Sequence, residues 1–405
     1  MKFSLTNFIK YYLVLYFVAL GIMYYLLITV TVYFIIFDVL VFALVFIEYM
    51  NRNIQAKGNI KYLFFLFIIF AFIGIAINDA SWLGAVKRLR FVIYPIIFLY
   101  LLQHKKLNVY YYKKIKSLLF TIGYIQAPIT IFQKFIYQYL PSNFKIAELV
   151  DYASGTIGGI NSSNMGCFMV ALFCLKIQEG MTNRMTKIII IQSVILIFPL
   201  FIIQSEAQFI FLPIMLIYIL YINKKLRFKY ILNTVFSIFA FFTMLDIILP
   251  MIGSQGILIR LQGVLPYLAQ TNISGNDSFE AVNRISQMGF LFLNNKLSLF
   301  GNGLGSFYEH FSYNTNLVNS MSLALNNQFL STYAETGLIG LMILVMIPTS
   351  VLLSSNIRTH NSKTIKLLSF QILINFIYIS PMYSFHLMFV YIYYYVISIR
   401  RINML

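Results

Sequence analysis

Long apolar runs, separated by short polar breaks, extend along almost the whole chain. Most of them contain about 15 to 22 residues, enough for a helix to cross a hydrocarbon core of roughly 30 Å. The pattern predicts an all-α polytopic membrane protein with one integral membrane domain, residues 1–405, and about twelve spans. The spans are expected near residues 11–28, 30–49, 62–78, 84–103, 117–139, 164–178, 188–204, 207–222, 231–250, 329–353, 366–380 and 384–399.

Composition excludes a soluble globule of this length. The chain is 60% hydrophobic and 18% aromatic but only 10% charged, and its mean hydropathy is +0.81. Too little polar surface remains to cover a water-soluble domain.

The basic residues predict the orientation of the spans. If the N-terminus is cytoplasmic, 22 of the 30 Lys and Arg residues fall in cytoplasmic segments, as the positive-inside rule requires. Both termini are then cytoplasmic. The net charge of +18 is mostly a topology signal, and no nucleic-acid partner is expected.

Two polar breaks are long, and this orientation places both on the outer side. The larger, residues 251–328, lies between the ninth and tenth predicted helices and is rich in Asn, Ser and Gly. The smaller one covers residues 140–163. The larger loop is long enough to hold chemistry, whereas the cytoplasmic breaks are too short for a nucleotide-binding unit.

Cations near the fourth span oppose the orientation rule. The run Phe91–Gln103 is too short to span alone, so the helix should begin near Trp82 and carry Lys87, Arg88 and Arg90 in its outer turns. An arginine at bilayer depth costs about 2.5–3.5 kcal/mol on insertion scales and usually faces a polar cavity or an anion. These side chains are therefore candidates for binding a phosphate-bearing substrate. The alternative is that they snorkel to lipid head groups.

The two outer loops contain further candidate residues. In the larger loop, Arg260 and Arg284 can bind phosphate oxygens, and Glu309 and His310 are candidate general bases. In the smaller loop, the glycine-rich run 155–166 includes two residues that can bind a sugar or cap the next helix, Asn161 and Asn164. For each of them the alternative is an ordinary solvated or capping residue.

Helical spacing predicts one shared face on the span after the larger loop. Its members are Asn326, Leu330, Tyr333, Gly337 and Gly340. The two glycines permit close approach by a neighbouring helix, which would turn Asn326 and Tyr333 towards the bundle interior. Packing alone would explain the glycines.

Two carboxylates lie in or beside apolar spans. Glu335 lies off the shared face, and Glu206 lies at the outer junction of two spans. An unpaired carboxylate is costly at this depth, so each is expected to meet a cation or a polar cavity.

The other ionisable groups point away from cofactor chemistry. Cys167 and Cys174 lie on one predicted helix, where they are expected to be small core residues. The outer loops contain no paired-carboxylate metal motif, and no stretch resembles a glycine loop for nucleotides. We expect neither a metal nor a cofactor.

Three segments together resemble the signature region of the bacterial O-antigen polymerase and O-antigen ligase superfamily. They are Asn283-Arg-Ile-Ser-Gln-Met-Gly-Phe-Leu-Phe-Leu293, Leu299-Phe-Gly-Asn-Gly-Leu-Gly-Ser-Phe307 and Asn326-Asn-Gln-Phe-Leu-Ser-Thr-Tyr-Ala-Glu-Thr-Gly-Leu-Ile-Gly340. The run 155–164 resembles the same family's glycine and asparagine segment.

The resemblance implies a multi-pass glycosyltransferase of the bacterial inner membrane. Its substrate would be a glycan linked to undecaprenyl pyrophosphate, used at the periplasmic face, and a flippase and a chain-length regulator of the same pathway could be partners. Arg284 matches the family's pyrophosphate-contacting arginine, and Glu335, Gly337 and Gly340 match its helix motif.

Two departures favour a polymerase over a ligase. This chain has Asn326 where ligases carry a histidine, and Ser205-Glu206 where they carry an arginine after a serine. The ligase, which transfers glycan to lipid A core, stays an alternative. So does a flippase that moves the same lipid without altering it, although flippases of similar span count have short loops on both sides.

The expected reaction is the displacement of undecaprenyl pyrophosphate from an anomeric carbon by a hydroxyl group. Arg284, with Arg88 and Arg90, would stabilise the charge on the leaving group without a metal. The hydroxyl proton would pass to His310, Glu309 or Glu335, among which the sequence does not choose.

Overall fold

The protein is helical through almost all of the chain that the computed structural model describes. The described residues are 5–19, 30–51, 53–54, 57–77, 82–136, 155–156, 162–183, 185–203, 206–225, 243, 299–301, 303–305, 328–354, 359–376 and 381–402. Their helices are α1 (Leu5–Val14), η1 (Leu15–Ala19), α3 (Val30–Met50), α4 (Ile60–Ile77), α5 (Trp82–Leu102), α6 (Val109–Phe135), α7 (Ser162–Asn183), α8 (Lys187–Ile202), α9 (Glu206–Ile222), α15 (Gln328–Leu353), α16 (His360–Asn375), η5 (Pro381–Tyr383) and α17 (Phe385–Arg400). Among these residues no strand forms, and β pairing is limited to one bridge between Ile54 and His104.

Four stretches of helix are long and apolar enough to cross a membrane within the described part of the chain. They are Ile60–Ile77, Val109–Phe135, Ser163–Thr182 and Ser331–Leu353. Further apolar helices are shorter. The described part of the chain is thus all-α with membrane-spanning character, whereas the predicted span 231–250, apart from Thr243, and most of both predicted outer loops lie outside the described residues.

Several helices begin earlier than the apolar runs predicted, because polar residues cap them. The helix expected from residue 117 begins at Val109, where the Asn108 side chain accepts a hydrogen bond from the Tyr111 amide (3.3 Å). The helix expected from residue 366 begins at His360, because Thr359 accepts one from the Ser362 amide (3.2 Å). A capping side chain satisfies an amide that the first turn leaves without a helical partner, so a helix can start in polar sequence.

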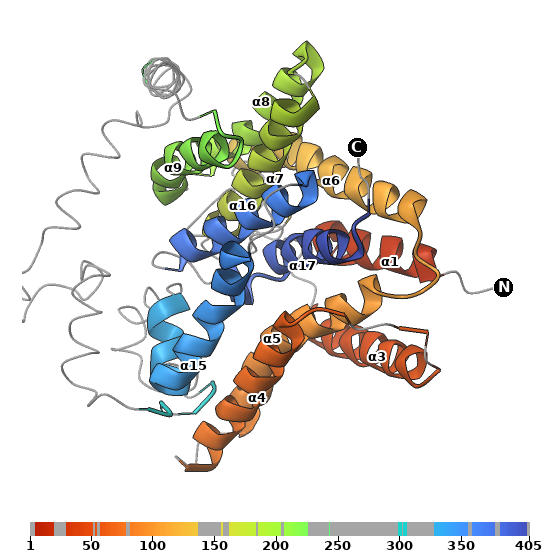
Figure 1. Ribbon diagram of the computed structural model, residues 1–405, viewed down its shortest axis with the longest axis vertical. Coiled ribbons are helices and arrows are strands. Elements are labelled where there is room, and N and C mark those ends of the chain that lie inside the picture. The colour runs from red at the N-terminus through yellow and green to blue at the C-terminus, as the bar shows by residue number, and fades with distance from the viewer. Residues whose placement is uncertain are drawn as a thin grey trace, which may run out of the picture.

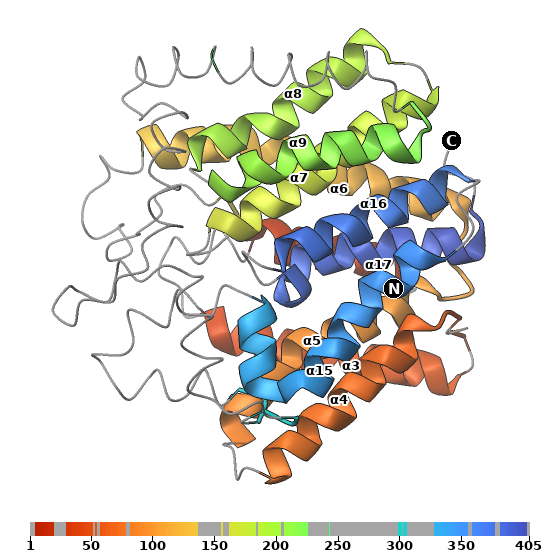
Figure 2. The same cartoon turned by 60° about the vertical axis from the view of Figure 1, so that its left-hand side comes forward.

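The helices pack in layers (Figures 1 and 2). Five of them form a closed ring of neighbours, in which each packs against the next: α4, α15, α16, α17 and α5. On the other side of α16 and α17 lie α7, α8 and α9, and α6 packs against α8. Helix α17 packs against α5, α16 and α7. Its residues from Phe385 to Ile397 are therefore almost all buried.

An aromatic core joins α1 and its continuation η1 to α5 and α17. The Phe385 ring stacks on Tyr16 (centroids 4.4 Å apart) and contacts Phe98 edge-on (4.9 Å). The Tyr16 and Tyr94 hydroxyls are hydrogen bonded at 3.2 Å inside this core. Aromatic contacts of this kind add to the stabilisation from buried area, so the core fixes the N-terminal helix against the C-terminal one.

Helix ends gather at two ends of the bundle. At the first, which we call the basic end, Thr182 contacts His360 (3.0 Å) and Arg400 donates to the Tyr112 hydroxyl (2.9 Å). Many of the described cations lie in or beside these segments, namely Lys57, Lys105, Lys106, Lys116, Lys176, Lys187, Lys224, Lys225, Lys363, Lys366, Arg400 and Arg401. The opposite end, which we call the Arg88 end, contains the site described next.

Candidate functional site

A buried ion pair joins α5 to α15 at the Arg88 end. Arg88 Nε lies 3.1 Å from Glu335 Oε2, and the two side chains are 10% and 0% exposed. The prediction that Glu335 meets a cation is confirmed. The predicted start of the helix at Trp82 is also confirmed, so Lys87, Arg88 and Arg90 lie in the first turns of α5. Each charge compensates the other where neither is solvated by bulk water.

The second oxygen of this carboxylate has a different environment. Glu335 Oε1 is buried, and no residue in the described part of the chain hydrogen bonds to it. The Gly305 amide also interacts with this carboxylate, so the segment around residues 299–305 meets the ion pair directly.

Helix α15 breaks two residues after Glu335. Gly337 has φ 69° and ψ −167°, and Gly301 also has a positive φ of 66°. A Cβ on Gly337 would lie 2.4 Å from both the Gly301 nitrogen and the Leu299 oxygen. The Ile339 amide, at the start of the second half of α15, donates to the Leu299 carbonyl (3.3 Å). The backbone of the segment around residues 299–305 therefore packs against α15 at this break.

This finding corrects the predicted helix face. Gly337 is approached by the backbone of a non-helical segment and not by a neighbouring helix, and the nearest side chain to Gly340 is Thr336 of its own helix. The positive φ interrupts the helical repeat, so residues before and after Gly337 cannot follow one face. Tyr333, at 3% exposed, lies in the interior as predicted.

The segment around residues 299–305 also packs against α4. Leu304 is fully buried in a cluster with Ala71, Ile75 and Ala85. A Cβ on Gly74 would lie 2.7 Å from the Phe300 oxygen. The glycine segment thus fills the space between α4 and α15 beside the ion pair.

The first turns of α15 are polar yet buried. Gln328 donates to the Thr332 hydroxyl (3.0 Å) and accepts from the Met382 amide (3.2 Å). Ser331 and Thr336 are also buried and donate to carbonyl oxygens of preceding residues. Such hydrogen bonds hold polar helical residues against a membrane-embedded interior.

The remaining predicted site residues fall in three groups. Asn164 is half-buried at the start of α7. Lys87 and Arg90 on α5 and Glu206 on α9 have described backbones but side chains outside the described set. The others lie outside the described residues altogether: Arg284, Arg260, Glu309, His310, Asn161 and Asn326. Of the predicted residues, the structure joins Arg88 and Glu335 by a direct contact.

Sequence reasoning missed two glutamines of α6 that hold Gly155 and Thr156 against this helix. Gln133 accepts from the Gly155 amide (2.8 Å) and donates to the Gly155 carbonyl (3.0 Å). Gln126, two helical turns earlier, accepts from the Thr156 amide and donates to its hydroxyl (both 2.9 Å). The available signal was the helical spacing of Gln126, Thr130 and Gln133, which places three polar side chains on one face of an apolar helix.

Replacing Gln133 by methionine is expected to lower the free energy of unfolding by about 1–3 kcal/mol, because the Gly155 amide and carbonyl stay buried without partners. Unfolding by sodium dodecyl sulfate in mixed micelles measures this loss. Thr121→Ala on the exposed face of α6 is the matched control and should change stability by no more than about 0.5 kcal/mol. Equal effects of the two substitutions would contradict the assigned role of Gln133.

The two cysteines belong to the hydrophobic core. Cys167 and Cys174 are buried core residues of α7, as predicted. Among the described side chains, no group of three or more His, Cys, Asp and Glu could hold a metal ion. Comparison of the sequence with protein-family models and with curated proteins finds no match.

Proposed function

We propose that the protein is a membrane glycosyltransferase that polymerises oligosaccharide repeat units linked to undecaprenyl pyrophosphate, at the periplasmic face of a bacterial inner membrane. The observation that carries this proposal is the meeting of three segments at one place. The cation-bearing start of α5, the glycine segment around residues 299–305 and the Glu335–Gly337 break of α15 are far apart in sequence but in contact in the fold. The last two belong to the segments that resemble the polymerase and ligase superfamily.

The distribution of charge supports the orientation that this function needs. Cations are concentrated at the basic end, which the positive-inside rule assigns to the cytoplasm. With about twelve spans and both termini at that side, the Arg88 end faces the periplasm. The ion pair then lies where a lipid-linked glycan would present its pyrophosphate.

In the proposed reaction, an acceptor hydroxyl oxygen bonds to the anomeric carbon of a second glycan. The bond from that carbon to the pyrophosphate oxygen breaks, and its electron pair leaves with undecaprenyl pyrophosphate. Arg88, together with Arg284 and Arg90, stabilises the charge that develops on the leaving group. The hydroxyl proton passes to a base.

The geometry of Glu335 separates its role from that of the other two candidate bases. Because Glu335 is fully buried and paired with Arg88, we assign it to positioning the guanidinium group. The proton acceptor is then His310 or Glu309 of the larger loop.

Arg88→Lys tests this proposal, because it keeps the charge but removes the planar fork that matches phosphate oxygens. We expect the rate of polymer formation to fall roughly 10- to 100-fold. The measurement uses protein reconstituted in liposomes with a lipid-linked repeat unit, and a glycan ladder on a gel is the readout. Lys134→Arg, a conservative change at the end of α6, is the control and should keep the rate of the unchanged protein.

The same assay separates the alternatives. Unchanged polymerisation by the folded Arg88→Lys variant would remove Arg88 from the reaction. Transfer to added lipid A core without chain growth would identify a ligase. Movement of the lipid across the bilayer with no new glycosidic bond would identify a flippase.

A further inference from the structure

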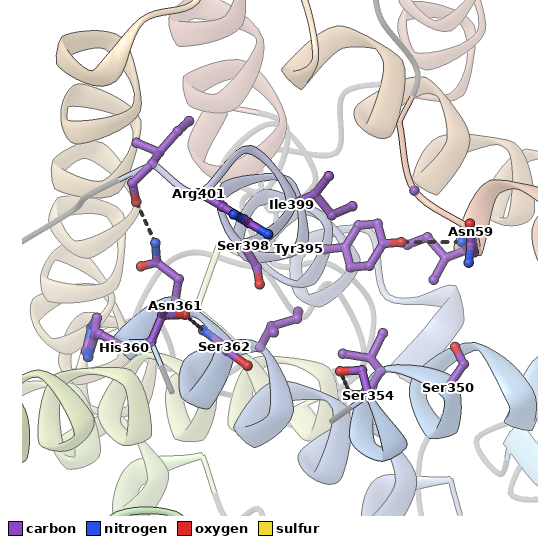
Figure 3. Close-up of a pocket in the computed structure, with 16 residues that line it drawn as sticks. Asn59, Ser350, Ser354, His360, Asn361, Ser362, Tyr395, Ser398, Ile399 and Arg401 are labelled. Atoms are coloured by element: carbon purple, nitrogen blue, oxygen red, sulfur yellow. Dashed lines mark hydrogen bonds between the residues drawn. The ribbon is translucent and has the colours of Figure 1, made fainter. Parts of the chain in front are cut away.

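A cavity of about 790 Å³ opens at the basic end, away from the Arg88–Glu335 pair. It lies between the ends of α15 and α17, the start of α16 and the residues before α4 (Figure 3). In Figure 3, Tyr395, Ser398 and Arg401 face Ser354 and Asn361 across it. The cavity belongs to no part of the proposed transferase site.

The lining is polar and carries positive charge without any carboxylate. Its side chains with hydroxyl, amide or imidazole groups are Asn59, Ser350, Ser354, Thr359, His360, Asn361, Ser362, Tyr395 and Ser398. Arg401 is the charged residue of the lining, and neither Asp nor Glu contributes to it. Hydrogen-bond donors around a guanidinium, with no carboxylate among the described lining residues, favour an anionic ligand.

The start of α16 adds to this preference. Thr359 caps the helix, and His360, Asn361 and Ser362 of its first turn all line the cavity. The Ser362 amide is taken by the Thr359 cap, but the other first amides of the helix have no intrahelical partner, and the helix dipole places partial positive charge there. Phosphate groups commonly bind at such a position. Together with Arg401, the helix start gives the cavity two independent sources of attraction for an anion.

Another part of the lining is apolar. Five aliphatic side chains contribute to it, namely Ile60, Val351, Ile365, Ile399 and Ile402. A small inorganic anion would leave this surface and most of the volume unused. The lining therefore fits a ligand with a phosphate at one end and an apolar portion at the other.

We propose that this cavity binds the phosphate group of an anionic amphiphile, with Arg401 and the first turn of α16 as its phosphate contacts. At the end assigned to the cytoplasm, the head group of an anionic phospholipid has this chemistry, and so does a soluble phosphate ester. The proposal depends on the membrane fold and not on glycosyl transfer, so the two proposals can fail separately.

Native mass spectrometry of the purified full chain provides the test, with phosphatidylglycerol or phosphatidylcholine added to the micelles. We expect one phosphatidylglycerol to be retained in preference to phosphatidylcholine. Arg401→Gln should weaken its binding about fivefold, the effect of one cation near an anionic lipid surface. Ser398→Phe should also weaken it, because the larger ring occupies the cavity.

Lys105→Gln is the matched control, because Lys105 is an exposed cation at the same end that does not line the cavity. A competition arm adds inorganic phosphate, which displaces the lipid if a soluble phosphate is the natural occupant. Loss of phosphatidylglycerol in the two cavity variants but not in Lys105→Gln supports the site. Equal retention of both lipids, or equal loss in Lys105→Gln and Arg401→Gln, overturns it.

Discussion

Replacing Arg88 by methionine is expected to lower the free energy of unfolding by about 3–5 kcal/mol, because the substitution leaves the Glu335 carboxylate buried without its cation. Arg88 is only 10% exposed and Glu335 is not exposed at all, so water cannot take over the role of the guanidinium. Equilibrium unfolding in mixed micelles measures the loss.

The double variant Arg88→Met/Glu335→Met separates the cost of an uncompensated charge from the value of the pair itself. It should recover most of the lost stability, because two apolar side chains of similar size can replace a buried pair at little cost. Lys116→Met is the control, since Glu179 is more exposed and keeps Lys176 as a second partner (3.1 Å). A double variant as unstable as Arg88→Met would show that the pair is not what stabilises this junction.

The second large effect is expected for Gly337→Ala. With φ 69° and ψ −167°, Gly337 lies in a region that is essentially restricted to glycine, and a residue with a Cβ there costs about 1–3 kcal/mol. Here the new atom would also lie 2.4 Å from backbone atoms of Gly301 and Leu299, which cannot move as a side-chain end can. We therefore expect a loss of more than about 3 kcal/mol, or displacement of the segment around residues 299–305. Unfolding curves and limited proteolysis of that segment measure these two responses.

Gly180→Ala in α7 is the matched control. Its added atom would lie 2.7 Å from the Met185 sulphur, which belongs to a flexible side chain. Its effect should stay within about 1 kcal/mol, the difference in helix propensity between glycine and alanine. If Gly337→Ala is as mild as Gly180→Ala and leaves the proteolysis pattern unchanged, the backbone contact at the break is not tight.

The sequence predicted the helices better than it predicted their contacts. Apolar runs identify helices because burial in lipid or in the bundle needs the same apolar residues, and the run at 62–78 corresponds to α4. Capped first turns were missed because Asn108 and Thr359 precede polar residues that a hydropathy pattern assigns to loops.

For the buried ion pair, the sequence predicts that Glu335 needs a partner but not which residue the partner is. A carboxylate in an apolar span must find a partner, so the need of Glu335 for a cation could be inferred from its cost alone. Arg88 is the partner of Glu335 because of the way α5 and α15 pack, and no local sequence pattern predicts that packing. The break at Gly337 and the cavity at the basic end arise likewise from segments distant in sequence.

The contact between Gly301 and Gly337 also divides the larger loop. The backbone there is fixed to α15 at residues 299–301. Only five peptide links separate Gly305 from His310. Even fully extended, they cover roughly 18 Å at about 3.6 Å per residue. Chain length alone therefore keeps the two proposed proton acceptors within that reach of Gly305, whose amide interacts with Glu335.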